Sequence, residues 1–174
     1  RLLPGTPGGM YVSASDEHDE AGIVISDVLA GLPFSLEIRN KIHAKRMKKL
    51  EGARAKDMRL PTLTGPADSD LTLMGWGSTY DAIEEACQLL RDVGVNVNHL
   101  HFTDLFPLPV EGVLGLLNSC REIVAIETNF SSQMVRLLRA ETGYTVKRTI
   151  NRYDGEPFTG EDIFNRLQEV LSRV

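Results

Sequence analysis

A turn of small and polar residues, Gly-Trp-Gly-Ser-Thr at 75–79, is the first stretch of the chain whose residue types could bind an anion. Glycines let backbone N–H groups approach a phosphate closely, and the start of the following helix carries partial positive charge. The run matches neither G-x-G-x-x-G nor the longer loop that ends in Gly-Lys-Ser/Thr. A tight turn before a helix capped by Ser78 and Asp81 is therefore the favoured interpretation. An anion site would use Gly75, Gly77, Ser78 and Thr79.

Two histidines separated by one residue, His99 and His101, are predicted to lie on the same face of a strand. A metal ion can use that spacing, but no third ligand is fixed nearby, so ordinary polar residues at a strand end are favoured and no metal site is predicted. If their strand lies beside the 75–79 turn, each imidazole would add positive charge there below about pH 6.5. Glu127 and Asn129 end a third apolar run, and Glu127 would cancel that charge.

The positions of Ser78 and of the two cysteines favour neither nucleophilic nor redox chemistry. Ser78 lacks the Gly-x-Ser-x-Gly turn of a hydrolase. Cys87 lies on an apolar helical stripe and Cys120 precedes a buried strand, so both are predicted to be small buried hydrophobic residues. The chain has no C-x-x-C pair to bind an iron–sulfur cluster or a structural zinc. Trp76 is predicted to be a packing or docking residue, and no catalytic residue is assigned.

Alternating strands and helices must position these side chains. Apolar runs predict strands at 71–74, 95–102, 123–126 and 145–150, and helical stripes predict helices at about 78–93, 111–118, 132–142 and 159–171. Gly94 and Gly143 stand where helices should end. Strand–helix–strand repeated three times predicts parallel strands with helices on both faces. The expected fold class is α/β, a three-layer α/β/α domain with a mostly parallel sheet over 71–174.

The first 70 residues differ in composition. Residues 1–33 are rich in Gly, Pro and acidic residues and predict an extended arm, whereas 34–70 predict a basic helix followed by a linker at 59–70. Between Ser35 and Arg59, nine basic side chains stand against three acidic ones, although the whole chain has a net charge of −5. Nucleic acid, an acidic partner or a solvated helix face would each account for this. The solvated face is favoured, because no aromatic residue in the segment could stack on bases.

The composition of the whole chain bounds its class. Its 174 residues, 42% hydrophobic and 25% charged, suit one sizeable core. No run approaches the roughly 18 apolar residues of a membrane span, so no membrane is predicted as a partner. No nucleic acid is predicted as a partner either, because the basic segment has no aromatic residue to stack on bases. Two cysteines are too few for a disulfide framework, and a reducing cytoplasm is the expected compartment.

Eight motifs stand in a recognisable order. The first three are Pro-Gly-Thr-Pro-Gly-Gly at 4–9, Asp-Glu-His-Asp-Glu-Ala-Gly at 16–22 and Lys-Arg-Met-Lys-Lys-Leu at 45–50. The others are the 75–79 turn and the motifs at 97–102, 126–130, 137–143 and 153–159. Together they resemble the α subunit of 2-oxoacid:ferredoxin oxidoreductases, the 2-oxoglutarate type above all. The first three resemble the end of its pyrimidine-binding domain and the helix beyond, and the rest resemble the next domain, which is similar to the C-terminal domain of transketolase.

The resemblance implies a complex that oxidatively decarboxylates a 2-oxoacid with thiamine diphosphate and magnesium. Electrons would pass through iron–sulfur clusters to ferredoxin, and coenzyme A would take the acyl group. The implied partners are a β subunit and, in some forms, γ and δ subunits. In this family the Gly-Asp-Gly…Asn element that holds the magnesium belongs to another subunit, and the cofactor-activating glutamate would precede Arg1. We therefore expect no cofactor in this chain, no activity from it alone, and a role in architecture and assembly. The alternative is a self-standing module that binds an anionic ligand at the strand ends.

Overall fold

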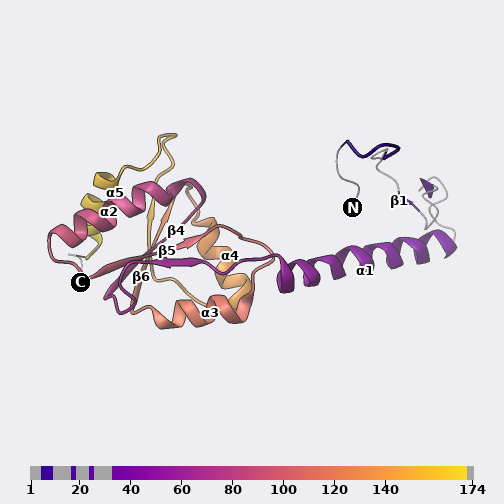
Figure 1. Ribbon diagram of the computed structural model, residues 1–174, viewed down its shortest axis with the longest axis horizontal. Coiled ribbons are helices and arrows are strands. Elements are labelled where there is room, and N and C mark those ends of the chain that lie inside the picture. The colour runs from indigo at the N-terminus through magenta and orange to yellow at the C-terminus, as the bar shows by residue number, and fades with distance from the viewer. Residues whose placement is uncertain (1–4, 10–16, 19–23, 26–32, 172–174) are drawn as a thin grey trace. The chain divides into compact units, whose positions relative to one another are not determined.

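The structure is a computed structural model that describes residues 5–9, 17–18, 24–25 and 33–171 (Figure 1). The chain divides into two compact units, Arg1–Glu51 and Gly52–Val174. Most of the predicted arm at 1–33 lies outside the described residues, and of the acidic cluster at 16–20 only Glu17 and His18 are described. Within the described ranges, no helix has both the length and the apolar character needed to cross a membrane.

The first unit contains a short strand pair and most of a long helix. β1 (Glu17–His18) pairs antiparallel with β2 (Val24–Ile25). α1 spans Pro33–Lys56 and continues into the second unit, so the helix predicted from residue 34 is confirmed and ends two residues earlier than expected. Its apolar residues Ile38, Ile42 and Leu50 are half-buried, and Met47 is exposed. The helix therefore has only a thin apolar stripe.

Five strands form the sheet of the second unit, in the order β3-β5-β4-β6-β7. β4 (Leu71–Trp76), β5 (Val97–Phe102), β6 (Glu122–Glu127) and β7 (Arg148–Asn151) run parallel to one another, while β3 (Thr62–Thr64) runs antiparallel to β5. Each helix between parallel strands returns the chain to the edge where the previous strand began. The predicted mostly parallel sheet is confirmed.

The segment at 59–70, predicted as a linker, is instead joined to the sheet. Its strand β3 pairs with β5, with Thr62 opposite His101 and Thr64 opposite His99. Arg59 adds a bidentate ion pair, because its guanidinium donates to both carboxylate oxygens of Asp104 at 2.9 and 3.0 Å. This contact lowers the pKa of Asp104 to about 2. The Pro and Gly residues that suggested a linker only limit the strand to three residues, which suits an edge position.

Four helices cover the two faces of the sheet and complete the predicted three layers (Figure 1). α2 (Tyr80–Asp92) and α5 (Gly160–Leu171) lie on one face, and α3 (Val110–Ser119) and α4 (Gln133–Thr142) on the other. Gly94 and Gly143 adopt left-handed φ angles of +87° and +75°, which confirms them as helix stops.

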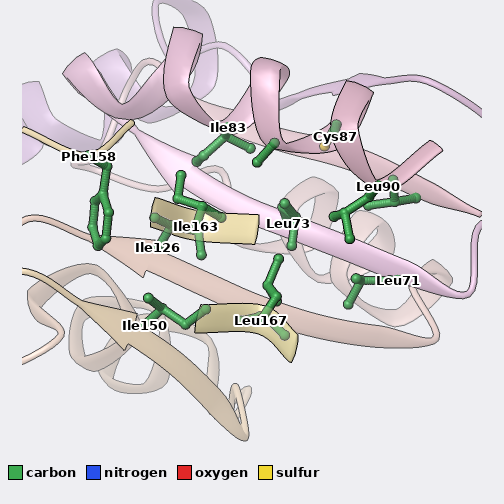
Figure 2. Close-up of a cluster of buried hydrophobic side chains, with 13 residues drawn as sticks. Leu71, Leu73, Ile83, Cys87, Leu90, Ile126, Ile150, Phe158, Ile163 and Leu167 are labelled. Carbon is green, nitrogen blue, oxygen red and sulfur yellow. The ribbon is translucent and has the colours of Figure 1, made fainter. Parts of the chain in front are cut away.

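A buried cluster lies on each side of the sheet. Figure 2 shows the cluster on the α2 and α5 side, where Leu73 of β4 and Ile126 of β6 point toward Ile83, Ile163 and Leu167 of the helices. Cys87 lies in this cluster with no exposed surface, as predicted. Burial raises the pKa of its thiol to about 12, so the sulfur is unreactive at neutral pH. The second cluster includes Met74, Leu100, Phe102, Leu117 and Leu138.

Candidate functional site

The predicted site residues lie on β4, β5, β6 and the loops that follow these strands. β4 has β5 on one side and β6 on the other, so the carboxyl ends of the three strands are neighbours. The helix that follows β4 lies on one face of the sheet and the helix that follows β6 lies on the opposite face. A crevice between such strands is where open α/β sheets commonly bind ligands.

The 75–79 turn is held by a hydroxyl that differs from the one predicted. Thr79 Oγ1 accepts a hydrogen bond from the Trp76 backbone N–H at 3.1 Å and donates to the Trp76 carbonyl at 2.9 Å. Thr79 is buried, whereas Ser78, the predicted cap, is exposed. The predicted cap formed by Ser78 and Asp81 is therefore wrong, because a single 3-10 turn, η2 (Gly77–Thr79), precedes α2 and moves Ser78 outward.

Glycine stands at two positions of this turn, Gly75 and Gly77, for different structural reasons. A Cβ at Gly75 would clash with the side chain of Ile83 and lie 2.6 Å from the Thr79 hydroxyl. Glycine at this position therefore lets α2 approach β4 closely. Gly77 instead has open space around its Cα but a left-handed φ of +59°. Packing explains the glycine at 75 and backbone geometry explains the glycine at 77, and neither explanation needs a bound anion.

The two histidines share one face of β5, as predicted, but they are buried beneath α2. His99 is 1% exposed, and its Nδ1 lies 2.7 Å from Oε1 of Glu84. Tyr80 contacts both imidazoles, with ring centroids 5.2 Å from His99 and 4.9 Å from His101. His99 Nε2 and His101 Nδ1 are buried without a hydrogen-bond partner.

Burial changes the electrostatic role predicted for these imidazoles. It lowers the pKa of His99 and of His101 below the ordinary value of 6.5, against the opposing influence of the Glu84 carboxylate. The expectation that each adds positive charge below about pH 6.5 is therefore wrong, because protonation begins at a lower pH. Among the described residues, no group of three or more His, Cys, Asp or Glu side chains is arranged to hold a metal ion.

Glu127 is buried at the end of β6, and its carboxylate accepts hydrogen bonds from N–H groups of the same chain. Its oxygens accept hydrogen bonds from the backbone N–H groups of Met134 and Val135 at 3.0 and 3.1 Å. Asn129 Nδ2 donates to it at 2.7 Å and Trp76 Nε1 at 3.4 Å. The carboxylate thus satisfies the N-terminal N–H groups of α4 and links the ends of β4 and β6.

Further polar contacts brace the same loop. Asn129 Oδ1 accepts from the Gln133 backbone N–H at 3.1 Å, and Asn151 Nδ2 donates to the Asn129 carbonyl at 2.7 Å. Ser132 adopts a left-handed φ of +52°, unusual for a residue other than glycine, and its hydroxyl donates to Asn151 Oδ1 at 3.1 Å. Sequence reasoning did not single out Ser132 or Asn151, because no local motif marks a contact between two separate loops.

An open pocket of about 490 Å³ lies at this edge of the sheet. It brings Ser78 and Thr79 together with residues that the sequence analysis did not select as a site, namely Thr128, Arg152, Tyr153, Gly155, Glu156, Pro157 and Phe158. The motif at 153–159 was the available signal for these residues. The two histidines, Glu127 and Asn129 do not line the pocket, so the eight predicted residues do not form one site.

The cation in this pocket is held by nearby acidic residues. Arg152 Nε donates to Asp154 at 2.9 Å, and its Nη1 donates to Asp162 at 2.6 Å and to the Pro157 carbonyl at 2.8 Å. The hydrogen bond from Arg152 lowers the pKa of Asp154, and backbone and side-chain hydrogen bonds from Thr159 lower the pKa of Asp162. Both carboxylates remain charged at neutral pH and offset the guanidinium, which weakens the attraction of this pocket for an anion.

Two remaining side chains can be compared with their predicted roles. Trp76 is half-buried and packs against the cluster on the α3 and α4 side, as predicted for a packing residue. Cys120 is half-buried against the cluster on the α3 and α4 side, and its Sγ donates to the Leu116 carbonyl at 3.3 Å, so it is less buried than predicted. It stands at the end of α3, where the chain leaves the helix before β6.

The second unit is therefore a three-layer α/β domain, and its pocket lies where β4 and β6 end. Residues 69–163 match the family described as pyruvate:ferredoxin oxidoreductase core domain II. The match covers more than half of the chain, so the chain belongs to this family.

Named relatives agree with that assignment. The chain is 31% identical over 171 residues to subunit alpha of 2-oxoacid:ferredoxin oxidoreductase 1 from Aeropyrum pernix, covering 94% of this chain and 25% of that protein. It is 29% identical to 2-oxoglutarate oxidoreductase subunit KorA from Mycobacterium tuberculosis, covering 98% of this chain and 24% of that subunit. The chain thus spans about a quarter of the length of these relatives. The resemblance to α subunits of 2-oxoacid:ferredoxin oxidoreductases is confirmed.

A solved structure extends the likeness to the fold. The 2-oxoglutarate:ferredoxin oxidoreductase from Magnetococcus marinus, described with 2-oxoglutarate, coenzyme A and succinyl-CoA bound, superposes with a TM-score of 0.70 at 28% identity. The superposition covers 97% of this chain and 28% of the other.

Proposed function

We propose that this chain is part of the α subunit of a 2-oxoacid:ferredoxin oxidoreductase and that it acts in architecture and subunit assembly. Family membership supports the first part. The observation that supports an architectural role is the environment of Glu127, a buried carboxylate at the strand ends whose oxygens accept hydrogen bonds from four N–H groups of the same chain. A carboxylate with that many donors stabilises the loop and is not open to a substrate.

This chain does not contain the full set of ligands that an iron–sulfur cluster of such an enzyme needs. An iron–sulfur cluster is bound by about four cysteine thiolates. The chain has two cysteines. Cys87 lies on α2 within the buried cluster, and Cys120 follows the end of α3. We expect thiamine diphosphate, magnesium and the clusters to be bound elsewhere in the complex. The β subunit is the partner that we propose, with ferredoxin and coenzyme A acting on the complex as a whole.

For the complex we propose 2-oxoglutarate as the substrate. The relatives from Mycobacterium tuberculosis and Magnetococcus marinus are named for 2-oxoglutarate, whereas the one from Aeropyrum pernix is named for 2-oxoacids in general. Assays of the complete complex with 2-oxoglutarate, pyruvate and 2-oxobutyrate would test this. The expected outcome is the highest kcat/KM with 2-oxoglutarate.

An assay of the chain alone tests the assembly role. The purified chain is incubated with thiamine diphosphate, magnesium, 2-oxoglutarate, coenzyme A and a viologen dye, and dye reduction is followed. We expect no reduction above a protein-free blank, because the chain lacks a ligand set for the clusters. Sustained turnover by the chain alone would contradict the proposal. Co-purification with a tagged β subunit from the same genome would support it.

A second candidate function is a module that binds an anionic ligand at the strand ends. The pocket of about 490 Å³ favours it, because Ser78, Thr79 and Arg152 line one opening near the start of α2. Titration of inorganic phosphate at pH 6, followed by backbone amide chemical shifts, separates the two candidates. Shifts confined to 75–79 and neighbouring loops would support an anion site. No localised shift, or shifts mainly at 39–59, would exclude it.

A further inference from the structure

Every exposed aromatic ring among the described side chains lies at the carboxyl edge of the sheet, where the parallel strands end. The exposed fractions are 40% for Tyr80, 51% for Phe106, 75% for Phe130 and 66% for Tyr153. Tyr80 begins α2 after β4, and the other three lie in the loops that follow β5, β6 and β7. The strand order places them in the sequence Phe106, Tyr80, Phe130 and Tyr153, across about 14 Å at the usual strand spacing. We call these four residues the aromatic row.

Ring contacts hold parts of the aromatic row in place. Phe130 and Tyr153 meet edge to face, with ring centroids 4.9 Å apart, so the loops after β6 and β7 present one joined apolar surface. Tyr80 packs against His99 and His101. Large rings whose positions are fixed by packing are typical of the centre of a protein interface, because they lose little conformational entropy when a partner covers them.

The charge around the aromatic row is negative. Four exposed carboxylates in the loops and first helical turns of this edge have no ion-pair partner among the described residues, namely Asp81, Glu111, Glu156 and Glu161. Among the described cations of the same loops and turns, Arg136 is exposed, whereas Arg152 is held by Asp154 and Asp162. A nucleic acid or an anionic membrane surface would be repelled. A basic protein surface with apolar side chains fits both the charge and the rings.

The size of the aromatic row distinguishes a domain of the same subunit from a separate subunit. The exposed parts of four rings, each of about 150–250 Å², amount to about 450 Å². A stable contact between separate proteins takes about 800 Å² from each partner, whereas domains of one chain are held by about 300–750 Å² a side. A smaller contact suffices within one chain, because the covalent link keeps the second domain at a high effective concentration.

We propose that the aromatic row docks a domain of the α subunit that lies outside this chain, through a basic and apolar surface of that domain. This rests on the proposed function, by which the chain is part of a longer α subunit. The chain spans about a quarter of the length of its relatives, which leaves room for such a domain. Tyr153 also lines the pocket of about 490 Å³, so the docked domain would cover this pocket. In the full subunit the pocket would then lie between two domains, where small molecules commonly bind.

Photo-cross-linking in the intact complex identifies the occupant. p-Benzoylphenylalanine replaces Phe130 or Tyr153 in the full α subunit, which is purified with its β subunit and irradiated, and mass spectrometry maps the products. We expect both positions to cross-link to one α-subunit segment outside this chain. Complexes that contain isotope-labelled and unlabelled α subunits show whether the link lies within one copy. Cross-links to the β subunit, to a second α copy or to no protein would overturn the proposal.

Val93 provides the matched control for the cross-linking position. It is 63% exposed but stands where α2 ends, at the opposite edge of the sheet. p-Benzoylphenylalanine in place of Val93 should not react with the segment that positions 130 and 153 reach. The same product from all three positions would overturn the proposal.

Reversal of one charge tests the basic character of the docked surface. Glu156→Lys should reduce the cross-link yield from position 130 at least about threefold, because like charges then face each other. Asp92→Lys, an exposed position at the opposite edge, should leave the yield unchanged. Equal yields from the two variants would overturn the assignment of a basic partner surface.

The same experiment separates failure of the docking surface from failure of the proposed function. If the gene for this chain encodes no further domain, or if no β subunit co-purifies, the proposed function fails and the docking proposal fails with it. If the complex forms and the cross-links lie elsewhere, only the docking proposal is overturned.

Discussion

Oε1 of Glu84 lies 2.7 Å from Nδ1 of His99, so a carboxylate on α2 holds a buried imidazole of β5. The contact joins two elements that are consecutive in the chain and packed against each other. It also fixes the imidazole so that its second nitrogen, Nε2, lies buried without a partner. The stability of this region should therefore depend on the carboxylate and on pH.

Removal of the Glu84 carboxylate should destabilise the fold. We expect Glu84→Ala to lower the free energy of unfolding by about 1–3 kcal/mol, because the buried His99 Nδ1–H loses its acceptor. Urea denaturation at pH 7.5 measures this. Glu84→Gln keeps an acceptor oxygen and should cost less than half as much. Equal losses for the two variants would contradict the role of the hydrogen bond.

Acidification should weaken the fold through the two buried histidines. Burial lowers the pKa of each in the folded state, so between the folded pKa and about 6.5 the unfolded chain binds more protons. Their contribution is fully present above pH 6.5 and is lost as pH falls toward the folded pKa. Urea midpoints measured from pH 8 to pH 5 should show this decline. His99→Gln should make the decline shallower, whereas His43→Gln on α1, which is exposed, should not change it.

Substitution of Gly75 should separate the packing role of this glycine from the conformational role of Gly77. Gly75→Ala forces the new Cβ against Ile83, and we expect a loss of about 1–3 kcal/mol. The double variant Gly75→Ala/Ile83→Val should recover part of that loss. Gly77→Ala has space for its Cβ and should cost only about 1 kcal/mol, from its left-handed φ. Thermal or urea unfolding that ranks Gly77→Ala as the costlier change would contradict this.

Substitution of Glu127 should loosen the link between β4 and β6. In Glu127→Gln an amide NH₂ replaces one acceptor oxygen and faces N–H donors, so we expect a loss of about 1–3 kcal/mol. Because Trp76 is the only tryptophan in the chain and donates to this carboxylate, its fluorescence should shift. Glu122→Gln at the other end of β6 removes a partly exposed ion pair with Arg148 and should cost about 1 kcal/mol or less, without a fluorescence change.

Limited proteolysis should cut the chain before β3. Most side chains of α1 between 36 and 56 are exposed, whereas Arg59 is tied to Asp104 and β3 to β5. We expect a resistant fragment that begins between residues 50 and 60, identified by mass spectrometry. A fragment that begins near Leu71 would mean that β3 separates readily from the sheet.

The sequence by itself determined the order and type of the elements from Leu71 onward. Continuous apolar runs such as 123–126 indicate strands buried on both faces, and stripes such as that of Ile83, Cys87 and Leu90 indicate helices packed on one side. These are short-range patterns, so they can be read without knowing what lies across the sheet. Glycines at helix ends are equally local, and Gly94 and Gly143 were identified correctly for that reason.

Only the tertiary structure decided what the polar residues do. Glu127, Asn129, His99 and His101 are candidate ligands by type, but their contacts lie on other elements. Glu127, Asn129 and His99 form hydrogen bonds with Met134, Gln133 and Glu84, and His101 packs against the ring of Tyr80. The edge strand β3 was hidden because three residues between Pro61 and Gly65 carry too little pattern, and its pairing with β5 spans more than thirty residues of chain. Arg152 was likewise not predicted as a pocket residue, because Ser78 and Thr79, which line the same pocket, are more than seventy residues away in the chain. Local patterns specify an element, whereas burial and hydrogen-bond partners depend on which distant residues the fold brings into contact.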